Sequence, residues 1–219
     1  MPAEPITPKG RRTMQRILAA ARQVMARTGY VTMRVSDVAE EAGLSLGALY
    51  RYFDNKEDLF DSLIGSTHED LYQASAGGGF DFAVAPYDAL FASNRGYLEH
   101  YFENRDVLRV LMEVMTVDTR FRDFWWEMRQ RHIRRFLAAL GRHHGLCGMT
   151  QKEATLRCEA VCSMVEMSAY AWFAQDELNK ATPSLDEATK TLTDIWYSAF
   201  FGNSAEVTDD SPIQLQETN

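Results

Sequence analysis

Hydrogen-bond donors and small side chains lie close together in the stretch LSLGALYRYFDNKEDLF, residues 44–60. Tyr50, Tyr52 and Lys56 carry hydroxyl and ammonium donors of the kind that contact phosphate oxygens. On a helix, Leu49 and Phe53 are spaced to face inward, which turns the start of that helix outward. The outward positions hold Leu46, Gly47, Ala48 and Tyr50, a mostly slim set that lets a helix enter the major groove of duplex DNA. The alternative is a core segment with stray charges.

Two short helices joined by a tight turn are needed to position these side chains. Hydrophobic spacing predicts a helix from about Arg11 that ends at Gly29, followed by a short helix that ends at Gly43. Ser45 is a good N-cap for the next helix, and Asp54 is able to cap the one after it. This arrangement is a helix-turn-helix unit, although generic helix pairs share the same pattern.

The charge is distributed unevenly along the chain. The whole sequence carries a formal net charge of −8, yet residues 9–34 hold seven Lys or Arg and no acid. So acidic a protein is not expected to coat nucleic acid, but a basic beginning permits local contact with phosphates. On charge alone, a solvated helix face is an equally good explanation.

Helical patterns also dominate the rest of the chain. They cover residues 87–103, 106–116 and 119–143, and two more helices open at Thr150 and at Ser184, the last ending at Gly202. Glu153 and Glu187 stand three residues after these two openings, as in capping boxes. The Gly-rich link 73–86 has no helical spacing, and no strand alternation is evident. The sequence therefore predicts an all-α fold.

The run VSDVAEEAGLSLGALYRYFDNKEDLF, residues 35–60, resembles the DNA-binding signature of TetR-family transcriptional regulators. The shared features are an Ala four residues before a Gly, an apolar residue and Ser at the turn, and then small-Leu-Tyr-x-Tyr-Phe-x-x-Lys-Glu. This resemblance implies DNA contacts from the recognition helix by Ser45, Leu46, Gly47, Ala48 and Tyr50, and phosphate contacts by Tyr52 and Lys56.

Two positions depart from the family pattern. Ala48 stands where a hydroxyl residue is common, so a base hydrogen bond would be replaced by an apolar contact, for example with a thymine methyl. Arg34 stands where many members have Thr at the start of the second helix. That change removes a capping hydroxyl and offers a long side chain for a phosphate contact.

The resemblance also implies a division of the chain and a set of partners. Members of the family are generally homodimers whose last two long helices, here about 150–178 and 184–202, pair with those of the second copy. Two-fold symmetry then places the two recognition helices on a near-palindromic double-stranded DNA operator. The expected parts are a flexible arm (1–10), a three-helix DNA-binding domain with the helix-turn-helix (11–56), an effector-binding and dimerisation domain (57–202) and a disordered tail (203–219).

Large soft side chains in the second domain suit a small apolar or aromatic effector. The expected ligand-binding residues are Tyr97, Tyr101, Met115, Trp125, Trp172, Phe173 and Trp196. Any one of them is more often core than pocket lining. Glu166 is the odd carboxylate on an apolar helix, and it either anchors a polar ligand head or pairs with an arginine at the dimer seam, the second being favoured.

Other classes of function have less support in the sequence. Neither a nucleophile–base pair nor a cofactor loop is recognisable, and the glycines at 77–79 lack the flanking strand of a phosphate loop. We therefore expect no catalytic site, cofactor or metal site, and expect Cys147, Cys158 and Cys162 to act as small hydrophobes. Neither a leader nor a membrane span is evident, which predicts a cytoplasmic protein.

Three functions follow from these observations. The first is a ligand-responsive repressor that a small effector releases from its operator. The alternatives are an all-α enzyme that uses the aromatic cavity, and a purely structural helical interaction module.

Overall fold

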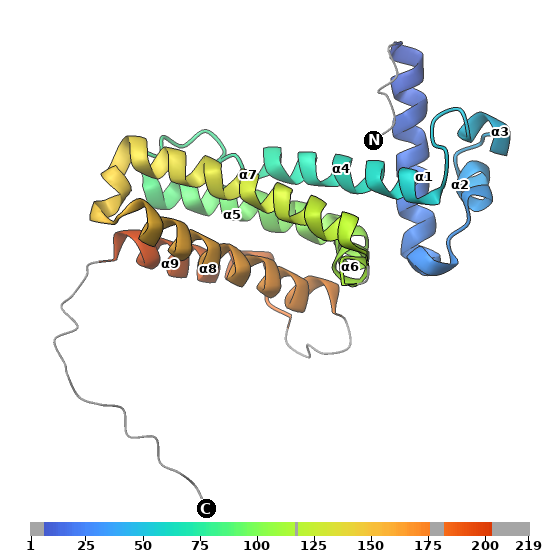
Figure 1. Ribbon diagram of the computed structural model, residues 1–219. Coiled ribbons are helices and arrows are strands. Elements are labelled where there is room, and N and C mark those ends of the chain that lie inside the picture. Colours follow the sequence, from blue (N-terminus) through green and yellow to red (C-terminus); the bar gives the residue numbers. More distant parts are fainter. Residues whose placement is uncertain (1–6, 117, 176–181, 203–219) are drawn as a thin grey trace, which may run out of the picture.

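The computed structural model describes residues 7–116, 118–175 and 182–202 (Figure 1). The secondary structure of these residues consists of helices joined by turns and loops, with no strand among them. A short 3₁₀ turn (Gly145–Gly148) and a π turn (Tyr170–Ala174) follow the seventh and eighth helices. Within the described ranges, no helix combines the length and the apolar character that crossing a bilayer requires. The helices are α1 (Pro8–Thr32), α2 (Val35–Glu41), α3 (Leu46–Leu49), α4 (Lys56–Ala74), α5 (Pro86–Glu103), α6 (Arg105–Val114), α7 (Thr119–His144), α8 (Gln151–Ala169) and α9 (Leu185–Phe201).

Helices α1, α2 and α3 and the first half of α4 form one end of the molecule, which we call the head (Figure 1). Its core is closed by Leu49, Phe53 and Phe60, each no more than 1% exposed. The turn between α2 and α3 needs Gly43, whose φ of +62° lies in the left-handed region. There the Leu44 N–H donates to the Ala39 carbonyl at 2.9 Å, which closes the end of α2.

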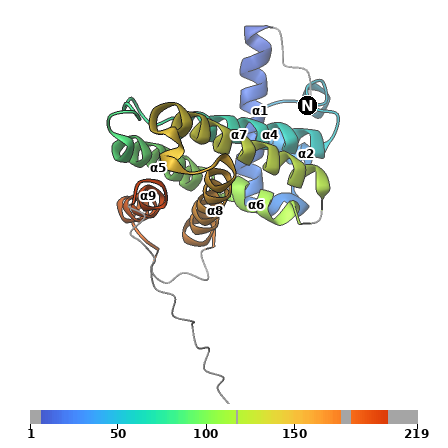
Figure 2. The same ribbon diagram turned by 60° about the vertical axis from the view of Figure 1, so that its left-hand side comes forward.

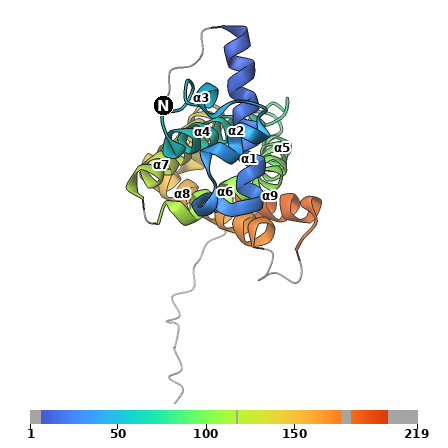
Figure 3. The same ribbon diagram turned by 90° about the vertical axis from the view of Figure 1, so that its right-hand side faces the viewer.

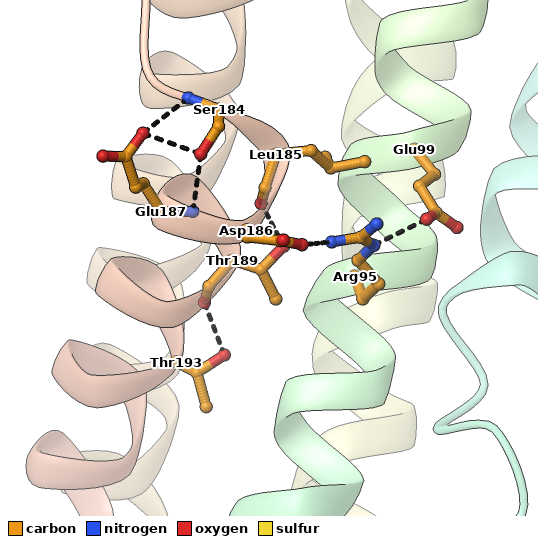
Figure 4. A network of polar contacts seen from close by, with 8 residues as sticks. All are labelled: Arg95, Glu99, Ser184, Leu185, Asp186, Glu187, Thr189 and Thr193. Atoms are coloured by element: carbon orange, nitrogen blue, oxygen red, sulfur yellow. Dashed lines mark hydrogen bonds and ion pairs between the residues drawn. The ribbon is translucent and has the colours of Figure 1, made fainter.

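The remaining helices form the body, in which α4 and α7 run along one side and α8 and α9 along the other (Figures 1 and 2). Helix α5 lies between these pairs and packs along α9. The start of α9 is held by its capping box and by Arg95 of α5, which contacts both Glu99 and Asp186 (Figure 4). Thr189 and Thr193 donate their hydroxyls to carbonyls of α9 one turn earlier (Figure 4), and the Thr193 hydroxyl also accepts from the Asn94 side chain of α5 at 3.0 Å.

Helix α6 is shared between head and body. Val107, Val110 and Leu111 belong to the head core, whereas Leu108 belongs to a body core that includes Leu98 and Phe173. Helix α6 packs against α1, and the view from the head end shows the two side by side (Figure 3). Any movement of α6 therefore acts on both cores.

Most of the predicted helix limits are confirmed, including both capping boxes and the breaks at Gly29 and Gly43. Three predictions need correction or restriction. Residues 8–10 are not a loose arm, because Thr7 caps α1 and Pro8 occupies its first turn. The N-cap of α4 is Asn55, whose side chain accepts from the Asp58 N–H at 2.7 Å, and not Asp54. The predicted 150–178 helix is too long, because α8 ends at Ala169 and a π turn ends at Ala174. Residues 1–6 of the arm, residues 176–178 and the tail lie outside the described residues.

Gly96 allows α4 and α5 to approach closely, because a Cβ there would lie 2.0 Å from the Ala74 carbonyl oxygen. We expect Gly96→Ala to lower the free energy of unfolding by about 1–3 kcal/mol, since backbone must move to admit the methyl group. Urea denaturation measures this loss. Gly141→Ala on α7, where a Cβ meets only the Leu146 side chain at 3.6 Å, is the matched control and should leave stability unchanged or raise it by up to about 1 kcal/mol. Equal stability of the two variants would contradict the close approach.

Candidate DNA-binding surface and ligand cavity

The outer edge of the head is formed by the start of α3, far from the body (Figure 1). Ser45 fixes that start by accepting from the Ala48 N–H at 3.2 Å, as an N-cap does. Leu49 anchors the helix from behind, since it is fully buried. The outward positions carry the predicted DNA-contacting residues: Ser45 and Gly47 are exposed, Leu46 is 42% exposed, Tyr50 is 47% exposed and Ala48 is half-buried.

Gly47 is not required by the packing of the chain itself. Among the described residues, no atom outside its own helix and its chain neighbours lies within 4 Å of the place where a Gly47 Cβ would be. Its backbone is helical, so it does not need the left-handed region either. A glycine that the fold does not require, at an exposed helix position, indicates close approach of the helix backbone to another molecule.

The predicted phosphate-contacting residues lie beside this edge, but the structure gives Lys56 a further role. Its Nζ donates to the Val31 carbonyl at 3.0 Å and lies 4.5 Å from the centre of the Tyr30 ring. Lys56 therefore joins the end of α1 to the start of α4, a contact that the sequence pattern did not indicate. Tyr52 is half-buried and packs against the head core.

Arg34 is exposed and stands at the N-cap position of α2. Within the described part of the chain, its side chain caps no backbone N–H of that helix. The expected loss of a capping hydroxyl is thus confirmed, while the phosphate contact stays a prediction.

A cavity of about 210 Å³ lies inside the body. Its wall is built from α4, the link after α4, and α5 to α9, so side chains far apart in sequence meet there. Four of the predicted ligand-binding residues line it: Tyr97, Tyr101, Trp125 and Trp196.

The other three predicted ligand-binding residues are not part of this wall. Met115 lies at the end of α6 and packs against the head core. Phe173 is 5% exposed in the body core, with its ring 5.6 Å from that of Phe102. Trp172 packs against the same core. Helical spacing alone does not distinguish such core positions from cavity positions, because both are turned away from solvent.

Polar side chains in the wall were largely missed by the sequence analysis. They are His68, Asn94, Arg129, His132, Arg135 and Glu166. Burial lowers the pKa of His68 to about 4 and that of His132 to about 3, so both rings are neutral at physiological pH. Two members of this set have a signal in the sequence: Glu166 is the odd carboxylate on an apolar helix, and His132 stands on an otherwise apolar helix edge.

Glu166 pairs with an arginine of its own chain. Arg129 of α7, which is 8% exposed, donates to the Glu166 carboxylate at 3.0 Å and to the Glu159 carbonyl at 2.5 Å, and also contacts the Ser163 hydroxyl. Burial raises the pKa of Glu166 to about 7, and the Arg129 charge opposes that rise. The favoured expectation that Glu166 pairs with an arginine is confirmed, and the pair joins α7 to α8 in the cavity wall, while its place at a dimer seam stays a prediction.

Comparison with known proteins agrees with this geometry. Residues 17–63 match the family model described as bacterial regulatory proteins, tetR family. The chain is 28% identical over 211 residues to the HTH-type transcriptional regulator EthR of Mycolicibacterium smegmatis, an alignment that covers 90% of this chain and 93% of that protein. It is 28% identical over 128 residues to the HTH-type transcriptional repressor KstR2 of Rhodococcus jostii, which covers 53% of this chain and 62% of that protein.

Solved structures share the fold. A transcriptional regulator of the TerR/AcrR family from Aquifex aeolicus superposes with a TM-score of 0.64 at 21% identity, covering 83% of this chain and 96% of that one. A TetR-like transcriptional regulator from Rhodococcus sp. RHA1 gives a TM-score of 0.65 at 22% identity, covering 87% and 97%. Residues 17–63 thus carry the DNA-binding domain of TetR-family transcriptional regulators, and the all-α chain shares its overall fold with solved structures described as members of that family.

Proposed function

We propose that this protein is a homodimeric repressor that releases a near-palindromic operator when a small apolar or aromatic effector occupies the cavity. The observation that carries the proposal is the position of Leu111 of α6. Its side chain lines the cavity and at the same time belongs to the buried core of the head. An effector in the cavity would therefore contact a helix that also packs in the core of the DNA-binding head.

The physical consequence of this arrangement is a coupling between two sites. An effector that packs against Leu111 favours one position of α6 over another, and α6 packs against α1 of the head. Two heads related by two-fold symmetry bind successive major grooves only at one spacing. A small displacement of α6 in each copy would change that spacing and lower the affinity for the operator.

A stripe on α8 supports the homodimer. Leu156 and Met167 are 56% and 53% exposed, and eleven residues along a helix bring them back to nearly the same side. Between them lie the small exposed residues Ala160 and Ser163. Large apolar residues flanking small ones allow two helices to pack closely, and Ile195 of α9 adds another apolar side chain at 45% exposure.

The sign of regulation rests on similarity alone. The Rhodococcus relative is named as a repressor. Release of the operator by an effector is also the simplest response for a protein whose ligand cavity borders the core of the DNA-binding head. We accordingly propose repression of the gene or genes next to the operator.

Binding to DNA from the promoter region of the protein's own gene tests the function directly. We expect a preference for this duplex over random duplex of equal length, and an affinity that falls steeply between about 50 and 200 mM salt because counterions are released. Fluorescence anisotropy measures both properties. Equal affinity for the two duplexes at every salt concentration would refute the proposal.

The variant Gly47→Ala distinguishes an effect on stability from an effect on DNA binding. We expect the variant to be as stable as the natural protein or more stable by up to about 1 kcal/mol, because Ala favours a helix and no neighbour opposes the methyl group. Operator affinity should nevertheless fall, by about tenfold for a loss of about 1.4 kcal/mol. Gly141→Ala in the body is the matched control and should bind as before. Unchanged operator affinity of Gly47→Ala would show that the backbone of α3 is not closely approached.

Charge placed on the α8 stripe should separate the two copies. We expect the double variant Leu156→Glu, Met167→Glu to be a folded monomer with much weaker operator binding, since burying unpaired carboxylates at an interface is costly. Light scattering after size exclusion gives the mass, and circular dichroism checks the fold. Val84→Glu, at an 81% exposed apolar position in the link before α5, is the control and should stay dimeric. A dimeric double variant would place the interface elsewhere.

A further inference from the structure

The cavity wall holds a histidine whose polar atoms are unused. His68 of α4 is 7% exposed and lines the cavity. Neither of its ring nitrogens has a hydrogen-bond partner among the described residues. Leaving a buried donor and a buried acceptor without partners is unfavourable, so a ligand group that bonds either ring nitrogen would be favoured at this point.

We propose, on the basis of the effector-binding function above, that the effector is an elongated, uncharged molecule with one hydrogen-bonding group, a hydroxyl or carbonyl, that His68 binds. A neutral imidazole is well matched to such a group, because one ring nitrogen donates and the other accepts. The lowered pKa of His68 agrees, since burial and then the nearby His100 and Arg131 keep the ring unprotonated.

The cavity wall holds two arginines and one carboxylate, but the hydrogen bonds that the arginines already make argue against an anionic ligand. Arg129 is already bound to Glu166, the Glu159 carbonyl and Ser163. Arg135 donates to the Tyr72 and Ser75 carbonyls, both at 2.6 Å, and so caps the end of α4. A carboxylate in the cavity would have to compete with these internal acceptors, and a buried ammonium would have to compete with Arg129 for Glu166.

The shape of the cavity argues for an elongated ligand. Trp125 and Phe136 both line it, and they are eleven residues apart on α7, about 17 Å along the helix axis. At the Phe136 end, the rings of Phe82 and Trp196 lie 6.0 and 5.3 Å from the Phe136 ring, and all three line the cavity. The apolar body of the ligand would pack among these aromatic side chains.

His68 lies at the opposite end, next to the head. Its ring is 5.7 Å from that of Phe124, which itself packs against the head core. The hydrogen-bonding group of the ligand would thus be held close to the helices that carry the DNA-binding surface. This placement links recognition of the polar group to the movement of α6.

Three ten-carbon probes that differ only in their head group test the proposal: 1-decanol, decanoate and decylammonium. Titration calorimetry on the full-length protein at pH 8 keeps Glu166 ionised, since its pKa is about 7. We expect 1-decanol to bind at least tenfold more tightly than either charged probe. Equal or tighter binding of decanoate or decylammonium, or no binding of 1-decanol, would overturn the proposal.

Substitution of His68 tests the residue itself. His68→Leu should melt at the same temperature as the natural protein or higher, because it removes two unpartnered nitrogens, and yet bind 1-decanol at least tenfold more weakly. His68→Gln keeps a donor and an acceptor and should bind better than His68→Leu. His143→Leu, at an exposed position near the end of α7, is the control and should bind as the natural protein does. Full affinity of His68→Leu for 1-decanol would overturn the role of His68.

The outcome for DNA separates this inference from the proposed function. Tight, His68-dependent binding of 1-decanol without any change in operator affinity would uphold the ligand class and refute the ligand-responsive repressor. If decanoate bound as tightly as 1-decanol and binding lowered operator affinity, the ligand-responsive repressor would be upheld and the uncharged ligand class refuted.

Discussion

The packing of α6 between the cavity and the head is the constraint on which the account rests. Leu111 contributes to the cavity wall and to the head core, and the neighbouring Val107 and Val110 are buried among head residues. Because a packed core has low compressibility, we expect a change in the cavity to shift helix α6 and not to be absorbed locally. The head is therefore not an independent module tied to the body by a flexible linker.

The charged residues of the body serve the same arrangement. Arg129 and Glu166 join α7 to α8, and Arg135 closes the end of α4, so the helices that surround the cavity are held by buried or half-buried polar contacts. Most donors of these groups are satisfied within the chain, although Arg129 Nε has no partner among the described residues, and the cavity wall holds two arginines against one carboxylate. The acidic character of the chain and the internally bonded charges of the cavity wall therefore have separate physical causes, one set by solvent and one by burial.

Local features of the fold could be read from the sequence, whereas tertiary ones could not. The capping boxes at Thr150 and Ser184 are local patterns, and they were predicted correctly. The start of α1 carries the same kind of signal in Thr7 and Pro8, but the Pro-rich composition of residues 1–10 favours a loose arm and so hides it. Whether an aromatic residue lines a cavity depends on several helices at once, which is why Tyr97 and Trp125 could not be told from Phe173. The partner of Glu166 and the unpartnered nitrogens of His68 depend in the same way on contacts made only after folding.

The coupling is tested most directly by its reciprocity. Calorimetric titration of 1-decanol into the free protein and into the protein bound to its operator gives two affinities, and their ratio is the coupling factor. The account predicts weaker ligand binding to the DNA complex, by the same factor by which saturating ligand weakens operator binding. Equal ligand affinity in the presence and absence of operator would contradict it, because the cavity and the DNA-binding surface would then not be coupled through α6.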